Sequence, residues 1–142
     1  MQIISIKLSM RGMASPRPIV TRFGTRMPQK YMDYKKLIQS KLRGFKKFGN
    51  VPLEVELNFF FKPSKSYKKN KYPVPKNDVD NLGKSVLDAM ESVLYENDTL
   101  VEKLTVTKKY DDVDCIVISI KETAIKKYSD SVTIEIEEVE VN

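Results

Sequence analysis

Two aspartates, Asp78 and Asp80, are the residues of this chain whose type and spacing best suit chemistry. They stand two positions apart where a polar loop becomes a helix-like pattern, and in extended backbone residues i and i+2 point the same way. Carboxylates that converge in this way repel each other unless a cation lies between them. Hard oxygen ligands suit Mg²⁺ or Mn²⁺, so the spacing favours a divalent metal site.

Asp98 is the candidate for a third carboxylate, since it ends the polar turn Glu96-Asn97-Asp98 after the predicted helix. A straight helix of about 15 residues would carry it roughly 22 Å from Asp80. Either the chain doubles back, or the partner acid comes from a neighbouring subunit. Sequence spacing leaves both possibilities open.

Each of these residues also has an ordinary structural interpretation. Asp and Asn are common helix N-cap residues, so on spacing alone capping is the commoner role for Asp78 and Asp80. Lys84 and Asp88, at positions i and i+4, fit a surface ion pair. Asp98-Thr99 alone predicts a turn.

Composition limits the chemistry further. The 142 residues are 41% hydrophobic and 31% charged, which predicts one globular domain spanning 1–142. There is no histidine, which excludes Ser-His and Cys-His catalysis and histidine-based zinc sites. The single cysteine, Cys115, lies in a strand-like run and is expected to be buried. No apolar run predicts a membrane span or a signal peptide, so we expect a cytoplasmic protein.

A net charge of +6 favours a polyanionic partner. Lysines crowd the aperiodic segment 62–77, expected to be a mobile loop that neutralises phosphates without reading sequence. Its alternative interpretation is a solvated loop, and its Tyr67 and Tyr72 either stack on bases or simply pack. Arg17 lies in a proline-containing segment expected to be an extended loop. The loop lysines are Lys62, Lys65, Lys68, Lys69, Lys71 and Lys76.

Periodicity predicts an α+β fold in which two helices pack on one face of a mixed or antiparallel sheet. The helices are expected at about 29–45 and 79–94, the latter with Asn81, Lys84, Ser85 and Asp88 on its polar face. Strands are expected at 2–8, 51–61 (central), 101–110 paired with 114–122, and 132–141. The last strand either pairs across a subunit interface or forms an ordinary edge.

The run Asp78-Val-Asp80-Asn-Leu-Gly-Lys84-Ser-Val-Leu-Asp88-Ala, followed by Tyr95-Glu-Asn-Asp98, resembles the signature of the RusA family of Holliday junction resolvases. That signature is Asp-x-Asp-Asn-Leu-x-Lys, with Asp-Ala four residues after the lysine, then an aromatic residue and a second acidic cluster. The early Pro-Arg-Pro loop and Lys108 are also similar. The resemblance covers most of residues 1–122.

The resemblance implies a homodimeric, Mg²⁺-dependent endonuclease of DNA recombination and repair that cuts four-way or other branched DNA, often phage-encoded, in a bacterial or infected host cytoplasm. Asp78, Asp80 and Asp98 match the family's metal-binding acids, and Lys84 matches its required lysine. Asn81 and Asp88 would support them, and Mn²⁺ would be a possible substitute metal. Lys84 would stabilise charge on the phosphate or the leaving oxygen.

Three features depart from the family pattern. The second acidic cluster, commonly Asp-Asp, is Asn97-Asp98 in this chain. Because the matching acid is kept, this departure should change the metal affinity rather than abolish metal binding. The basic residues usually just before the first aspartate lie upstream, in 62–71, and the tail after Glu122, about 123–142, is a longer extension than expected. Two alternatives remain: a basic nucleic-acid-binding protein without catalysis, and an enzyme for flaps, forks or single-stranded junctions.

Overall fold

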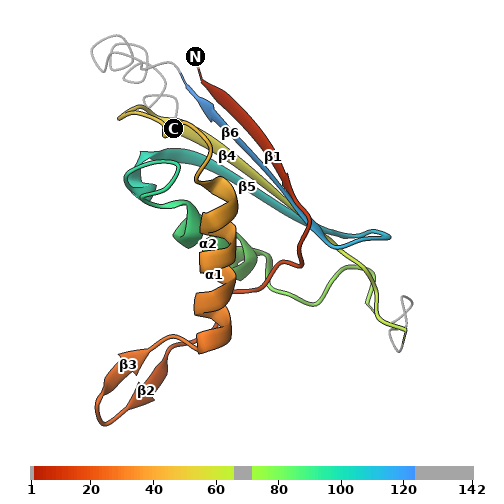
Figure 1. Ribbon diagram of the computed structural model, residues 1–142. Coiled ribbons are helices and arrows are strands. Elements are labelled where there is room, and N and C mark those ends of the chain that lie inside the picture. Colours follow the sequence, from red (N-terminus) through yellow and green to blue (C-terminus); the bar gives the residue numbers. More distant parts are fainter. Residues whose placement is uncertain (1, 66–71, 124–142) are drawn as a thin grey trace, which may run out of the picture.

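The computed structural model describes residues 2–65 and 72–123, which form an α+β domain (Figure 1). Two α-helices, a short 3₁₀ helix and two sheets follow one another along the chain. Their order is β1 (Ile3–Leu8), β2 (Ile19–Thr21), β3 (Gly24–Arg26), α1 (Gln29–Leu42), β4 (Leu53–Phe61), α2 (Val79–Met90), η1 (Asp98–Leu100), β5 (Val101–Tyr110) and β6 (Cys115–Glu122).

The main sheet has the strand order β1-β6-β4-β5. β6 runs antiparallel to both β1 and β4, whereas β4 and β5 are parallel, so the sheet is mixed. The central position predicted for β4 is confirmed. The predicted pairing of β5 with β6 is wrong, because β4 lies between them and α2 provides the crossover that a parallel pair requires.

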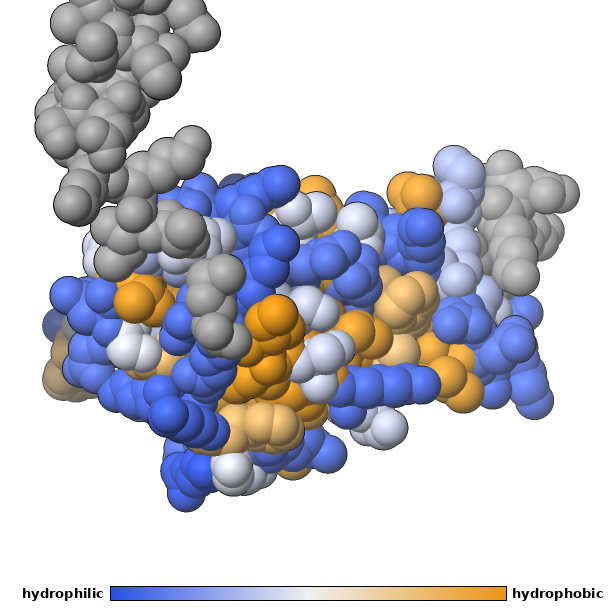
Figure 2. Space-filling view, turned by 90° about the horizontal axis from the view of Figure 1, so that it is seen from above, coloured by the Kyte–Doolittle hydropathy of each residue, from blue (hydrophilic) through white to orange (hydrophobic). Residues whose placement is uncertain are grey.

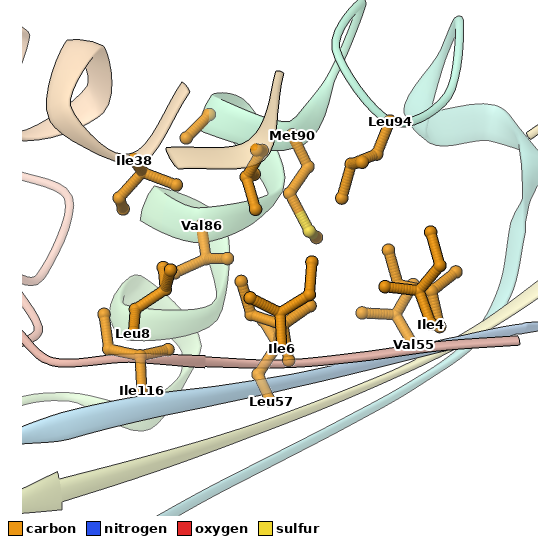
Figure 3. Packing of buried hydrophobic residues seen from close by; sticks show 14 of the residues in the cluster. Ile4, Ile6, Leu8, Ile38, Val55, Leu57, Val86, Met90, Leu94 and Ile116 are labelled. Atoms are coloured by element: carbon orange, nitrogen blue, oxygen red, sulfur yellow. The ribbon is translucent and has the colours of Figure 1, made fainter. Parts of the chain in front are cut away.

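Both helices lie on one face of this sheet, as predicted (Figure 1). Alternate side chains of β4 point into the core, and Figure 3 shows Val55 and Leu57 among the strand side chains that face Ile38 of α1 and Val86 and Met90 of α2. Cys115 is buried, as expected. Hydrophobic residues gather near the middle of the view in Figure 2, with hydrophilic residues around them.

The helices differ from their predicted limits on one side. α1 ends at Leu42 and α2 at Met90, where the backbone of Glu91 turns to an extended conformation. Ser85, predicted on the polar face of α2, is fully buried because α1 covers it. Its hydroxyl lies 3.1 Å from the Tyr34 hydroxyl and donates to the Leu82 carbonyl at 2.8 Å.

The proline-containing segment expected to be an extended loop instead contains a second sheet. β2 and β3 form a short antiparallel hairpin that projects beyond the start of α1 (Figure 1). The predicted strand 132–141 and the centre of the predicted mobile loop, residues 66–71, lie outside the described residues. In the ranges described, no helix is long and apolar enough to cross a membrane.

Candidate active site

The carboxylates of Asp78 and Asp80 lie at the N-terminus of α2, and both residues are exposed. Asp78 is the N-cap residue, with extended backbone (φ −65°, ψ 125°), yet its side chain makes no capping hydrogen bond. Among the residues that the structure describes, the Asp80 side chain accepts a local bond alone, from the Asn81 N–H at 2.9 Å. The Asp78 side chain therefore does not cap the helix. Both carboxylates lie at the positive end of the helix dipole, which favours negative charge there.

Two lysines accompany these aspartates. Lys84 is exposed one turn further along α2. Lys108 reaches the same end from β5, where its ammonium donates to the Asn77 carbonyl at 2.6 Å, one residue before Asp78. Lys108 was not among the predicted site residues. Its place depends on the parallel pairing of β4 with β5, which no local pattern reveals.

The segment that leads to the β2–β3 hairpin is attached to the same helix end. The Ser15 N–H donates to the Asn81 carbonyl at 2.9 Å, so the Asn81 backbone holds this segment at the start of α2. Arg17, predicted to contact DNA, follows two residues later and is exposed. This attachment places the start of the hairpin segment beside Asp80.

Asp98 lies in η1, beyond the other end of α2. The chain reverses there through Ser92, whose positive φ of 68° marks a tight turn, and the Ser92 N–H donates to the Tyr95 carbonyl at 2.7 Å. The buried Tyr95 hydroxyl donates to Asp98 Oδ1 at 2.6 Å and also contacts the Leu87 carbonyl at 3.3 Å. Burial and the bond to Asp98 raise the pKa of Tyr95, so its proton stays available to hold Asp98.

Two further acids surround Asp98. The hydrogen bond and negative charge of Asp98 raise the pKa of Glu91, and the charge of Asp88 adds to this effect. The predicted ion pair between Lys84 and Asp88 is wrong: among the described residues Asp88 is bonded instead by the Tyr31 hydroxyl, at 3.2 Å. Burial is the main cause that raises the pKa of Tyr31 to about 12. Glu96 pairs with Lys47 and is thereby occupied elsewhere.

The predicted acids thus form two groups at opposite ends of α2. Asp98 approaches the helix near Leu87, seven residues or about 10 Å of helical rise from Asp80. No cluster of three His, Cys, Asp or Glu side chains suited to a metal ion occurs within 2–65 and 72–123. One chain therefore brings Asp78, Asp80 and Lys84 together but leaves Asp98 apart, beside Asp88 and Glu91.

The predicted DNA-binding lysines follow β4. Lys62, Lys65 and Lys76 are exposed, whereas Lys68, Lys69, Lys71 and Tyr67 lie outside the described residues. The backbone N–H of Lys62 is held by Asp114 Oδ1 at 2.8 Å, and the Lys76 ammonium lies 4.1 Å from the Tyr72 ring centroid. This tyrosine is therefore engaged by a cation–π contact within the chain.

The sequence of this chain matches one family of known proteins. No curated protein sequence matches the chain significantly. The model of the family described as endodeoxyribonuclease RusA matches residues 10–137, which include Asp78, Asp80, Lys84 and Asp98. This match spans most of the 142 residues, and the chain belongs to the endodeoxyribonuclease RusA family.

Proposed function

We propose that this protein is a metal-dependent Holliday junction resolvase that acts on branched DNA in recombination and repair. The observation that carries the proposal is the pair of exposed carboxylates on Asp78 and Asp80, beside Lys84 and Lys108, in a chain of an endodeoxyribonuclease family. The Asp78 side chain makes no capping hydrogen bond, and the Asp80 carboxylate accepts the neighbouring Asn81 N–H. This donor set of hard oxygens fits Mg²⁺, with Mn²⁺ as a substitute.

Asp78, Asp80 and Asp98 would hold the metal. A bound divalent ion supplies Lewis acidity toward the scissile phosphate and lowers the pKa of an attacking water, which a chain without histidine needs. Lys84, exposed on the same helix, binds the phosphate and stabilises the charge that develops on its oxygens. Lys108 fixes the Asn77 carbonyl and thereby positions Asp78. Tyr95 donates a hydrogen bond to the Asp98 carboxylate and would hold it in position for the metal.

The separation of the acids supports a site shared by two chains. Within one chain Asp98 is held beside Leu87, about 10 Å of helical rise along α2 from Asp80, and no cluster of three acids suited to a metal ion occurs within residues 2–65 and 72–123. A two-fold homodimer that sets the start of one α2 beside the η1 of its partner would complete two equivalent sites. Paired sites suit a four-way junction, whose approximate two-fold symmetry requires two cuts.

The basic residues that follow β4, together with Arg17 in the segment before β2, would bind the DNA backbone. Lys62, Lys65, Lys76 and Arg17 are exposed, and contacts of this kind neutralise phosphates without reading bases. Lys68, Lys69 and Lys71 would add further phosphate contacts. Binding should therefore weaken steeply as salt rises.

The test is cleavage of an end-labelled four-way junction beside a linear duplex of matched sequence, with Mg²⁺, Mn²⁺ or EDTA. Asp80→Asn is the active-site variant, and Asp112→Asn, in the exposed turn before β6, is the matched control. We expect paired, metal-dependent cuts near the crossover by the wild type and the control, and none by Asp80→Asn. Junction binding without cuts under any metal would instead identify a structural DNA-binding protein.

A further inference from the structure

The β2–β3 hairpin projects from the domain (Figure 1), and hydrogen bonds fix its tip. Ile19 pairs with Arg26, Val20 with Thr25 and Thr21 with Gly24, whose positive φ of 125° only glycine adopts readily. The Thr21 hydroxyl accepts the Phe23 N–H at 3.2 Å and donates to the Gly24 carbonyl at 3.2 Å. The tip is thus a hydrogen-bonded turn that fixes the backbone of Phe23.

This hairpin exposes apolar side chains to solvent. Phe23 is 88% exposed and Val20 79% exposed, the two highest values among the large exposed hydrophobic residues. Nothing lies within 4 Å of a Cβ built on the adjacent Gly24. A phenylalanine so exposed loses the stabilisation that burial would provide, so the hairpin tip suits an occupant that covers the ring.

The surroundings of Phe23 identify the chemistry of that occupant. The Arg22 guanidinium carbon lies 5.0 Å from the Phe23 ring centroid, Arg17 precedes β2, and Arg26 is the last residue of β3. The first 32 residues contain no Asp or Glu, so the whole hairpin is cationic. An aromatic ring among arginines complements a nucleic acid, because the ring stacks on a base while the guanidinium groups bind phosphates.

The hairpin is also continuous with the candidate active site. Ser15 is bonded to Asn81 at the start of α2, and Phe23 follows eight residues later. Eight residues span at most about 29 Å of extended chain. DNA that reaches Asp78 and Asp80 therefore passes within range of the hairpin tip.

We propose that Phe23 stacks on a base that is unstacked at the branch point of the DNA, while Arg22 and Arg26 bind the flanking phosphates. This proposal rests on the branched substrate of the proposed function and adds the residue that recognises the branch. Linear duplex keeps its bases stacked, so Phe23 contributes to the binding of junctions and not of duplex. Val113 provides a contrast, because it is 56% exposed but its neighbours Asp111, Asp112 and Asp114 repel phosphates.

The absence of tryptophan from the chain allows a direct test. Phe23→Trp and the control Val113→Trp each introduce a single tryptophan, which is excited selectively over the tyrosines, in an Asp80→Asn background that leaves the DNA uncut. We expect the four-way junction to quench the fluorescence at position 23 and not at position 113, and linear duplex to quench neither. Phe23→Ala should weaken junction binding by about 5- to 150-fold, the range of one base–aromatic stack, with Phe23→Trp restoring it.

Three fluorescence results would overturn the proposal. They are unchanged fluorescence at position 23 with a saturating junction, equal quenching by duplex, and a spectral change that depends on protein concentration without DNA, which would assign the hairpin to a second copy of the chain. None of these measurements uses cleavage. Stacking by a protein that cuts no DNA would contradict the proposed function alone, and cleavage with unchanged Phe23→Ala binding would contradict this inference alone.

Discussion

Replacement of Gly83 by alanine should destabilise the protein, although the same change usually stabilises a helix. Gly83 is buried in α2, and a Cβ at this position would lie 2.8 Å from Val106 Cγ2 on β5. Alanine gains about 1 kcal/mol of helix propensity over glycine. Overpacking against a stiff valine costs about 1–3 kcal/mol, so the net loss of stability is about 1 kcal/mol.

A double-mutant cycle tests this reasoning by urea unfolding of the wild type, Gly83→Ala, Val106→Ala and the double variant. Removal of the obstructing methyl group should let Gly83→Ala stabilise the Val106→Ala protein by about 1 kcal/mol, a coupling of about 2 kcal/mol. Gly44→Ala is the control, since nothing lies within 4 Å of its Cβ position. Stabilisation by Gly83→Ala in the wild-type background would refute the close approach of α2 to β5.

Three further predictions concern the residues around the two acidic groups. Unfolded Tyr31 ionises near 10.0 and the folded residue near 12, so stability falls as pH rises through this interval. Denaturation midpoints should therefore drop less between about pH 9 and about pH 11 in Tyr31→Phe than in the wild type. Tyr95→Phe removes the bond to Asp98, which should lower Mg²⁺ affinity about 10-fold, measured from the metal dependence of cleavage. Lys108→Met releases the Asn77 carbonyl and should lower kcat by at least about 10-fold, with junction affinity in a binding assay nearly unchanged. A normal rate would exclude its positioning role.

Local sequence patterns predicted the elements in which a periodic pattern of apolar residues extends over many positions. The alternation in β4 and the apolar stripe of α2 suffice because one buried face determines each element. The loop-to-helix position of Asp78 and Asp80 followed from the same stripe.

What the patterns missed depends on contacts between distant residues. The three-residue strands of the β2–β3 hairpin are too short for a periodic signal, and two prolines obscured them. Ser85 is buried because a second helix covers it. β5 and β6 follow each other in the sequence, but β4, which comes much earlier in the chain, lies between them in the sheet. The sequence also left open whether Asp98 returns to Asp80, a question of chain reversal at Ser92.

The shared metal site is tested most directly by complementation between two inactive variants. Asp80→Asn and Asp98→Asn are co-expressed with different affinity tags, and heterodimers are isolated through both tags in turn. In a shared site, one of the two centres in each heterodimer regains a full set of native acids. We predict that the heterodimer nicks four-way junctions with Mg²⁺ while each variant homodimer is inactive. An isolated heterodimer that binds the junction but makes no nick would contradict a site built from two chains.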